Sequence, residues 1–94
     1  MNQTDLQECL KLLRIFADEA RLNILNLIGD EKLSGRDILE KYPMHQPTLS
    51  YHLKILCDNA ILNAENKWRW TYYTINKEKL QRVIELLKQL EVTK

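Results

Sequence analysis

Residues 46–56 constrain the fold more than any other segment, because they combine a helical apolar stripe with an unusual outer side. Leu49, Leu53 and Leu56 recur at the spacing that places them on one side of a helix. The opposite side carries short or hydrogen-bonding side chains and a single cation, on Pro47, Thr48, Ser50, Tyr51 and Lys54. The segment therefore predicts a short amphipathic helix that packs one side on a core.

The outer side of this helix lacks the residues that solvated helices usually expose. Good helix formers such as Glu, Lys, Arg and Gln favour such surfaces, whereas this side is rich in Thr, Ser and Tyr and has no acid before Asp58. Side chains of this kind can reach base edges and phosphates when a helix lies in a groove of DNA. The pattern predicts a DNA recognition helix.

Length and composition predict one small domain. The 94 residues are enough for a single modest core, so we expect one domain over residues 1–94. No apolar run is long enough to span a membrane, and no signal peptide is visible. Two cysteines do not form a disulfide framework, which favours a cytoplasmic setting. The formal net charge of +1 is low for a monomeric DNA-binding domain, but a dimer that gathers its cations on one surface tolerates it.

The N-terminal third contains two expected helices with recognisable ends. Thr4 can cap the first helix, with Gln7 completing a capping box. Asp18 is expected to cap a second helix over residues 19–28, and Gly29 to end it.

A third short helix and a final helix have similar signals. Ser34 with Asp37 forms a capping-box pattern that opens a helix ending before Pro43, and the helix of residues 46–56 follows after a tight turn. Asn76 is expected to cap a final helix of about fifteen residues.

Two β-prone segments lie between these helices, at residues 61–64 and 70–75. Asn66, in the connection, can take the left-handed turn conformation. The predicted fold is mainly α with a small β-hairpin (α+β), in the order α-α-α-α-β-β-α. This is the winged helix-turn-helix arrangement, whose second helix enters the major groove while the hairpin tip reaches backbone or minor groove.

The hairpin itself allows two interpretations. Lys67 and Arg69, flanked by Trp68 and Trp70, suit a wing tip that contacts DNA phosphates. The alternative is a solvated hairpin whose tryptophans only pack on the domain.

Three segments resemble the ArsR/SmtB repressors: residues 16–25 (FADEARLNIL), 46–56 (QPTLSYHLKIL) and 70–73 (WTYY). The resemblance extends over essentially the whole chain. It implies a homodimeric repressor, paired through its first and last helices, that binds an inverted-repeat double-stranded DNA operator and releases it when an inducer binds.

The resemblance also assigns expected roles to residues. It places Gln46, Pro47, Ser50 and Tyr51 nearest the bases and Lys54, Lys67 and Arg69 at phosphates, and the expected recognition-helix set further includes Thr48 and His52. The expected dimer contacts are the apolar residues of the terminal helices: Leu6, Leu10, Leu13, Leu80, Val83, Ile84, Leu87 and Leu90. Apolar stripes wider than one small core needs agree with such a dimer.

The sequence departs from the family at its well-known metal sites. Where metal sensors often carry Cys-x-Cys at the start of the third helix, this chain has Ser34 and Arg36, and residues 77–92 contain no His. We therefore expect no metal and no cofactor. The inducer stays open: an apolar small molecule between the terminal helices, oxidation of a thiol, or no effector.

The cysteines and histidines each have a structural and a functional interpretation. Cys9 and Cys57 are either buried small side chains or a redox pair. His52 either packs and hydrogen-bonds or contacts DNA, and His45 either contacts phosphate or is a plain turn residue.

Two other classes of function compete with a repressor. Ser50 and His52 are two residues apart on a helix and cannot pair for catalysis, so we do not expect an enzyme. A winged-helix module that binds protein stays as the alternative, together with a repressor that responds to oxidation of Cys9 and Cys57.

Overall fold

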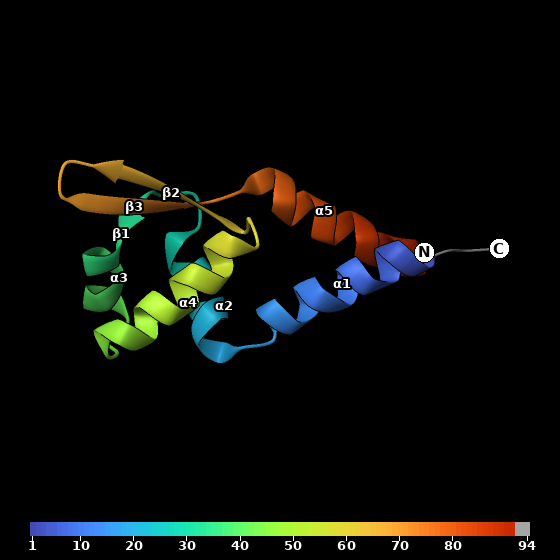
Figure 1. Cartoon of the computed structure of the whole chain (residues 1–94), viewed down its shortest axis with the longest axis horizontal. Coiled ribbons are helices and arrows are strands. Elements are labelled where there is room, and N and C mark those ends of the chain that lie inside the picture. Colours follow the sequence, from blue (N-terminus) through green and yellow to red (C-terminus); the bar gives the residue numbers. More distant parts are fainter. Residues whose placement is uncertain (92–94) are drawn as a thin grey trace.

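The computed structural model describes residues 1–91, in which five α-helices accompany one small antiparallel sheet (Figure 1). The elements in chain order are α1 (Gln3–Phe16), α2 (Glu19–Ile28), β1 (Leu33–Ser34), α3 (Gly35–Lys41), α4 (Gln46–Asp58), β2 (Leu62–Lys67), β3 (Trp70–Ile75), α5 (Lys77–Lys88) and the 3₁₀ turn η1 (Gln89–Glu91). The predicted order of helices and hairpin strands is confirmed, and β1 is an addition that the sequence did not indicate.

The sheet has the strand order β1-β3-β2, with both pairings antiparallel. β2 and β3 form the wing, in register from Leu62 opposite Ile75 to Lys67 opposite Trp70. β1 adds only the pair of residues that leads into α3, with Ser34 opposite Tyr72. The base of the wing is thereby fixed to the helix-turn-helix.

Most of the predicted helix caps are confirmed. The Asp18 carboxylate accepts from the Arg21 backbone N–H at 3.1 Å. The Ser34 hydroxyl accepts from the Asp37 N–H while the Asp37 carboxylate accepts from the Ser34 N–H, which is the full capping box.

The first cap is a correction. The Asn2 side chain accepts from the Asp5 N–H at 2.8 Å, so Thr4 lies inside α1 instead of capping it. Both residues are of cap-forming type, and the helix begins earlier than expected.

The turn of the wing is a second correction. Asn66 lies within β2 opposite Thr71, and it is Trp68 that adopts a positive φ of 63°. Strand pairing runs up to Lys67 and Trp70, so cross-strand register, and not local preference, decides which residue turns.

The core lies between α2, α3, α4 and the base of the wing, and extends to the inner sides of α1 and α5. Its largest fully buried side chains are Ile24, Ile28, Ile38, Leu56, Ile61 and Leu86. α1 buries Cys9, Leu12 and Ile15, whereas Leu6, Leu10 and Leu13, which are expected dimer contacts, are exposed, so the helix is apolar on two sides.

Helices α1 and α5 lie side by side at one end of the elongated molecule, which measures 52 × 23 × 19 Å (Figure 1). We call this pair of helices the terminal arm. The Arg82 guanidinium joins them by donating to Asp5 at 3.0 Å and to Glu8 at 2.9 Å. In the part of the chain that the structure describes, no helix is long and apolar enough to cross a membrane.

Candidate nucleic-acid interface

Helix α4 has the two-sided burial that its sequence predicts. Leu49, Leu53 and Leu56 are buried in the core. The opposite side exposes all six of its polar, prolyl and tyrosyl positions: Gln46, Pro47, Thr48, Ser50, Tyr51 and Lys54. Their contact with DNA is still a prediction, but they are placed where a partner can reach them.

His52 does not lie on that exposed side, which corrects its inclusion among the expected DNA contacts. Its side chain is buried, and its Nδ1 lies 3.2 Å from the Arg21 Nη1. The Tyr51 ring meets the imidazole edge-on, with centroids 5.4 Å apart. His52 therefore packs and hydrogen-bonds inside the protein, which was the other interpretation of this residue. Its ring also contacts the exposed Tyr51.

Arg21 connects three segments of the chain. Its Nε donates to the Ile15 carbonyl oxygen at 2.8 Å, its Nη2 lies 3.8 Å from the Asp18 carboxylate, and its Nη1 faces His52. Because a guanidinium only donates, the His52 Nδ1 must be the acceptor, and the ring proton lies on Nε2. The backbone N–H and the guanidinium of Arg21 hold the pKa of Asp18 below its usual value. The end of α1, the start of α2 and helix α4 thus share one anchor.

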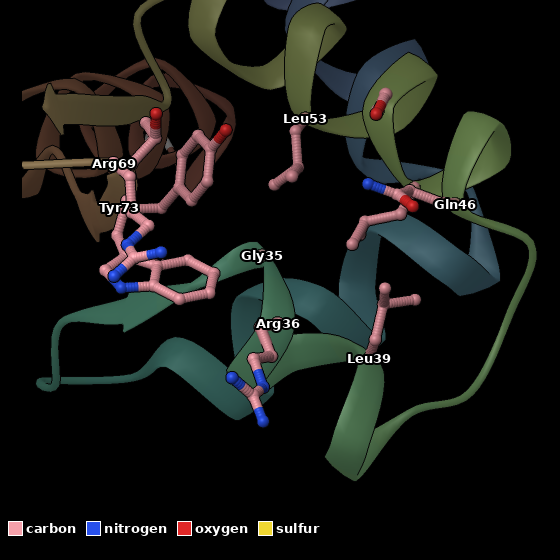
Figure 2. Close-up of a pocket in the computed structure, with 11 residues that line it drawn as sticks. Gly35, Arg36, Leu39, Gln46, Leu53, Arg69 and Tyr73 are labelled. Carbon is pink, nitrogen blue, oxygen red and sulfur yellow. The ribbon is translucent and has the colours of Figure 1, made fainter.

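A hollow of about 450 Å³ separates α4 from the wing (Figure 2); we call it the wing hollow. Gln46 and Ser50 of α4, Arg36 of α3 and Arg69 of the wing line it. Polar side chains from three elements thus border the hollow, together with leucines of α3 and α4.

Arg36 is a candidate contact that sequence reasoning missed. Its guanidinium lies 5.7 Å from the Trp70 ring centroid and 3.6 Å from the Glu40 carboxylate, and its side chain is exposed. An exposed ion pair of this kind is weak, so Arg36 stays available to a phosphate. The sequence signal is the position of Arg36 in the first turn of α3, two residues after the Ser34 cap.

The two cations of the wing are accessible. Lys67 and Arg69 are exposed and have no ion-pair partner among the described residues. Lys54 lies 3.1 Å from Asp58, but both side chains are exposed and the pair is readily exchanged. The exposed residues of α4, together with Arg36, Lys67 and Arg69, form what we call the recognition surface.

The two tryptophans have different surroundings. Trp70 contacts Arg36 and is 38% exposed, whereas Trp68 at the tip is 98% exposed and therefore projects away from the domain. The interpretation in which both tryptophans pack on the domain is therefore wrong for Trp68.

Most of the expected dimer contacts are exposed on the two helices of the terminal arm. The six exposed contacts are Leu6, Leu10, Leu13, Ile84, Leu87 and Leu90. Leu80 is half-buried. Val83 is only 6% exposed and belongs to the core, which corrects its place among the expected contacts.

Both cysteines are free thiols. Cys9 is buried and Cys57 half-buried. Burial, together with the charge of Asp58, raises the pKa of the Cys57 thiol and so lowers its reactive thiolate fraction. Within residues 1–91, no three His, Cys, Asp or Glu side chains are grouped to hold a metal ion.

The profile of the arsR family of bacterial regulatory proteins matches residues 18–63. An arsenical resistance operon repressor of Staphylococcus aureus is 35% identical over 81 residues, covering 86% of this chain and 78% of that protein. The transcriptional activator HlyU of Vibrio cholerae is 32% identical over 79 residues, covering 84% and 73%. A solved structure of Vibrio cholerae HlyU superposes with a TM-score of 0.78 at 29% identity, over 96% of this chain and 97% of that one. With this fold and these relatives, the chain belongs to the ArsR family of winged helix-turn-helix transcriptional regulators.

Proposed function

We propose that this regulator is a homodimeric repressor that binds a double-stranded operator with α4 in the major groove and the wing on the adjacent backbone. The observation that carries the proposal is the recognition surface. Its α4 side holds polar groups and no acid before Asp58, and unpaired cations lie beside it on the wing among the described residues. A helix-turn-helix reads bases with such a side and is held in register by phosphate contacts.

The residues of the recognition surface would contact two different parts of the DNA. Gln46, Pro47, Thr48, Ser50 and Tyr51 occupy the first two turns of α4 and would lie nearest the base edges. The cations at the borders, Lys54, Lys67, Arg69 and Arg36, would contact phosphates. In the proposed complex, one strand of the DNA backbone would pass over the wing hollow, which lies between these two groups.

A second copy of the chain would cover the terminal arm. Six large apolar side chains are uncovered there, and a stripe of this kind supports an interface between like copies. A two-fold dimer would present two recognition surfaces to an inverted repeat. It would also double the wing cations on one side, which compensates for the net charge of +1 per chain.

Release of the operator by an inducer is part of the proposal. Ser34 and Arg36 leave no thiolates at one standard metal position. The raised pKa of Cys57 argues against a thiol switch that works through its thiolate. An operator as the partner would place the activity in the cytoplasm.

The test is selection of duplexes from a random-sequence pool by the full chain, followed by sedimentation of the protein alone and bound. We expect an inverted repeat with half-site centres about one helical turn apart, bound by two chains. Recovery of no preferred sequence, or selection of a single half-site by a monomer, would contradict the proposal. Binding to proteins without any affinity for DNA at low salt would favour the protein-binding alternative.

A further inference from the structure

The tip of the wing contains an unusual residue for its backbone. Lys67 and Trp70 pair across the strands, so Trp68 and Arg69 alone form the turn. Trp68 has φ of 63°, and the first position of a two-residue turn with positive φ usually holds glycine. A large L-residue in this conformation is strained.

The indole of Trp68 gains nothing inside the protomer in return. It is 98% exposed, and no hydrogen bond or ring contact with the other described residues involves it. Backbone strain of this kind is typical of functional positions. A strained turn residue whose side chain packs on nothing in the protomer indicates contact with another molecule.

The surroundings of Trp68 indicate the chemistry of that molecule. Lys67 and Arg69 flank it as cations without an ion-pair partner in residues 1–91, and the nearest acid in β2, Glu65, is already bound by Lys32 at 2.8 Å. The tip therefore offers two positive charges around one flat apolar ring. A nucleic acid matches both, because phosphates alternate with the apolar faces of sugars and bases.

The tip also points toward the duplex that α4 would bind. Arg69 lines the wing hollow together with Gln46 and Ser50 of α4. In Figure 1 the turn between β2 and β3 lies at the end of the molecule opposite the terminal arm, near α3. One duplex can therefore contact α4 and the tip together.

We propose that Trp68 inserts its indole into the minor groove beside the site of α4, against sugar and base edges, while Lys67 and Arg69 hold the flanking phosphates. Apolar side chains that enter the minor groove are an established way for proteins to grip a duplex. The inference rests on the proposed function, since it needs a duplex held by α4. The indole would add an apolar contact to the phosphate contacts of Lys67 and Arg69.

The first test measures affinity and stability in the same variants. Trp68→Asn and Trp68→Gly remove the indole and accept positive φ more easily. We expect each to bind the duplex selected by the wild type roughly tenfold more weakly or worse. Their thermal midpoints should be unchanged or higher, because strain is relieved. A midpoint that falls in parallel with affinity would overturn the assignment, since the indole would then support the fold.

The second test observes the ring itself. The chain has two tryptophans, so Trp70→Phe leaves Trp68 as the single reporter, with the affinity of this variant as its own reference. Free Trp68 should be fully accessible to acrylamide, and the selected duplex should quench its emission and shield it. Equal accessibility with and without duplex would refute the insertion.

The two proposals fail in different ways. If the wild type selects no duplex at all, the proposed function is wrong and the insertion is wrong with it. If the wild type selects a duplex and Trp68→Asn binds it equally well, only the insertion is wrong.

Discussion

The terminal arm and the recognition surface lie at opposite ends of the chain's long axis and expose opposite chemistries. The arm presents leucines and one isoleucine in a stripe, at 37% to 68% exposure. The exposed side of α4 presents hydroxyl, amide and amino groups around one tyrosine. An apolar stripe is best covered by a dry interface, whereas hydrogen-bonding groups work in a wet one. The comparison indicates two separate binding surfaces on one small fold.

The charges of the two regions are also arranged differently. In the arm, Arg82 binds Asp5 and Glu8, and this hydrogen bonding holds the pKa of Glu8 below its usual value. In the wing, Lys67 and Arg69 have no such partners within the described residues. Arg82 thus joins α1 to α5 within the protomer, whereas Lys67 and Arg69 are accessible to a ligand beside α4.

The largest effect is expected from a charge placed on the apolar side of the arm. Leu87→Glu should separate the two chains, because the carboxylate would be buried without a partner in a dry interface. Affinity for a two-half-site duplex should fall about a hundredfold or more, since the second half-site is then no longer tethered. Sedimentation and shift assays measure both effects. Gln81→Glu, which adds the same charge outside the stripe, is the control, and an intact Leu87→Glu dimer would contradict the assignment.

The next test concerns the reading of bases by α4. Replacing Ser50 and Tyr51 by Ala should weaken binding by about 1–3 kcal/mol for each hydrogen bond to a base that is removed, and should relax sequence preference. Binding to a scrambled duplex should change little. Unchanged affinity for the selected duplex would remove these residues from the base-reading set.

A smaller and uniform effect is expected from the phosphate contacts. Lys67→Ala, Arg69→Ala or Arg36→Ala should weaken binding to all sequences alike and reduce the salt slope by about 1 each. Lys11→Ala on α1 removes the same charge far from the recognition surface and should leave the slope unchanged. A loss restricted to one sequence would contradict a phosphate role.

The smallest effect is expected from a change in the cap of α3, which alters the stability of the fold and not the recognition surface itself. Ser34→Ala removes the α3 cap and should cost about 1 kcal/mol of unfolding free energy. The N–H and hydroxyl of Ser34 hold the pKa of Asp37 below its usual value, so the stability from this carboxylate is present at neutral pH and is lost as pH falls through its folded value. Acid titration of unfolding should therefore be shallower in Ser34→Ala. An identical acid profile would argue against this coupling.

The sequence predicts the structure correctly at most places where a local signal decides it. The caps at Asp18, Ser34 and Asn76 are short-range hydrogen bonds, and the pattern of α4 is fixed by helical spacing. The exposed side of α4 was predictable for the same reason.

Apart from the first cap, where Asn2 and not Thr4 caps α1, the features that the sequence did not predict depend on residues far away in the chain. β1 is two residues long, and only its pairing with Tyr72 and Tyr73 makes it a strand. The left-handed residue of the wing follows from cross-strand register. Val83 and Leu87 share one apolar helix side, and only the packing of α5 on α1 decides which of them is buried.

The Arg21 guanidinium has a mechanical consequence. It touches the last turn of α1, the start of α2 and the inner side of α4 at once. A tilt of α1 relative to α4 would lengthen either the hydrogen bond to the Ile15 carbonyl or the contact with His52, so one side chain ties the terminal arm to helix α4.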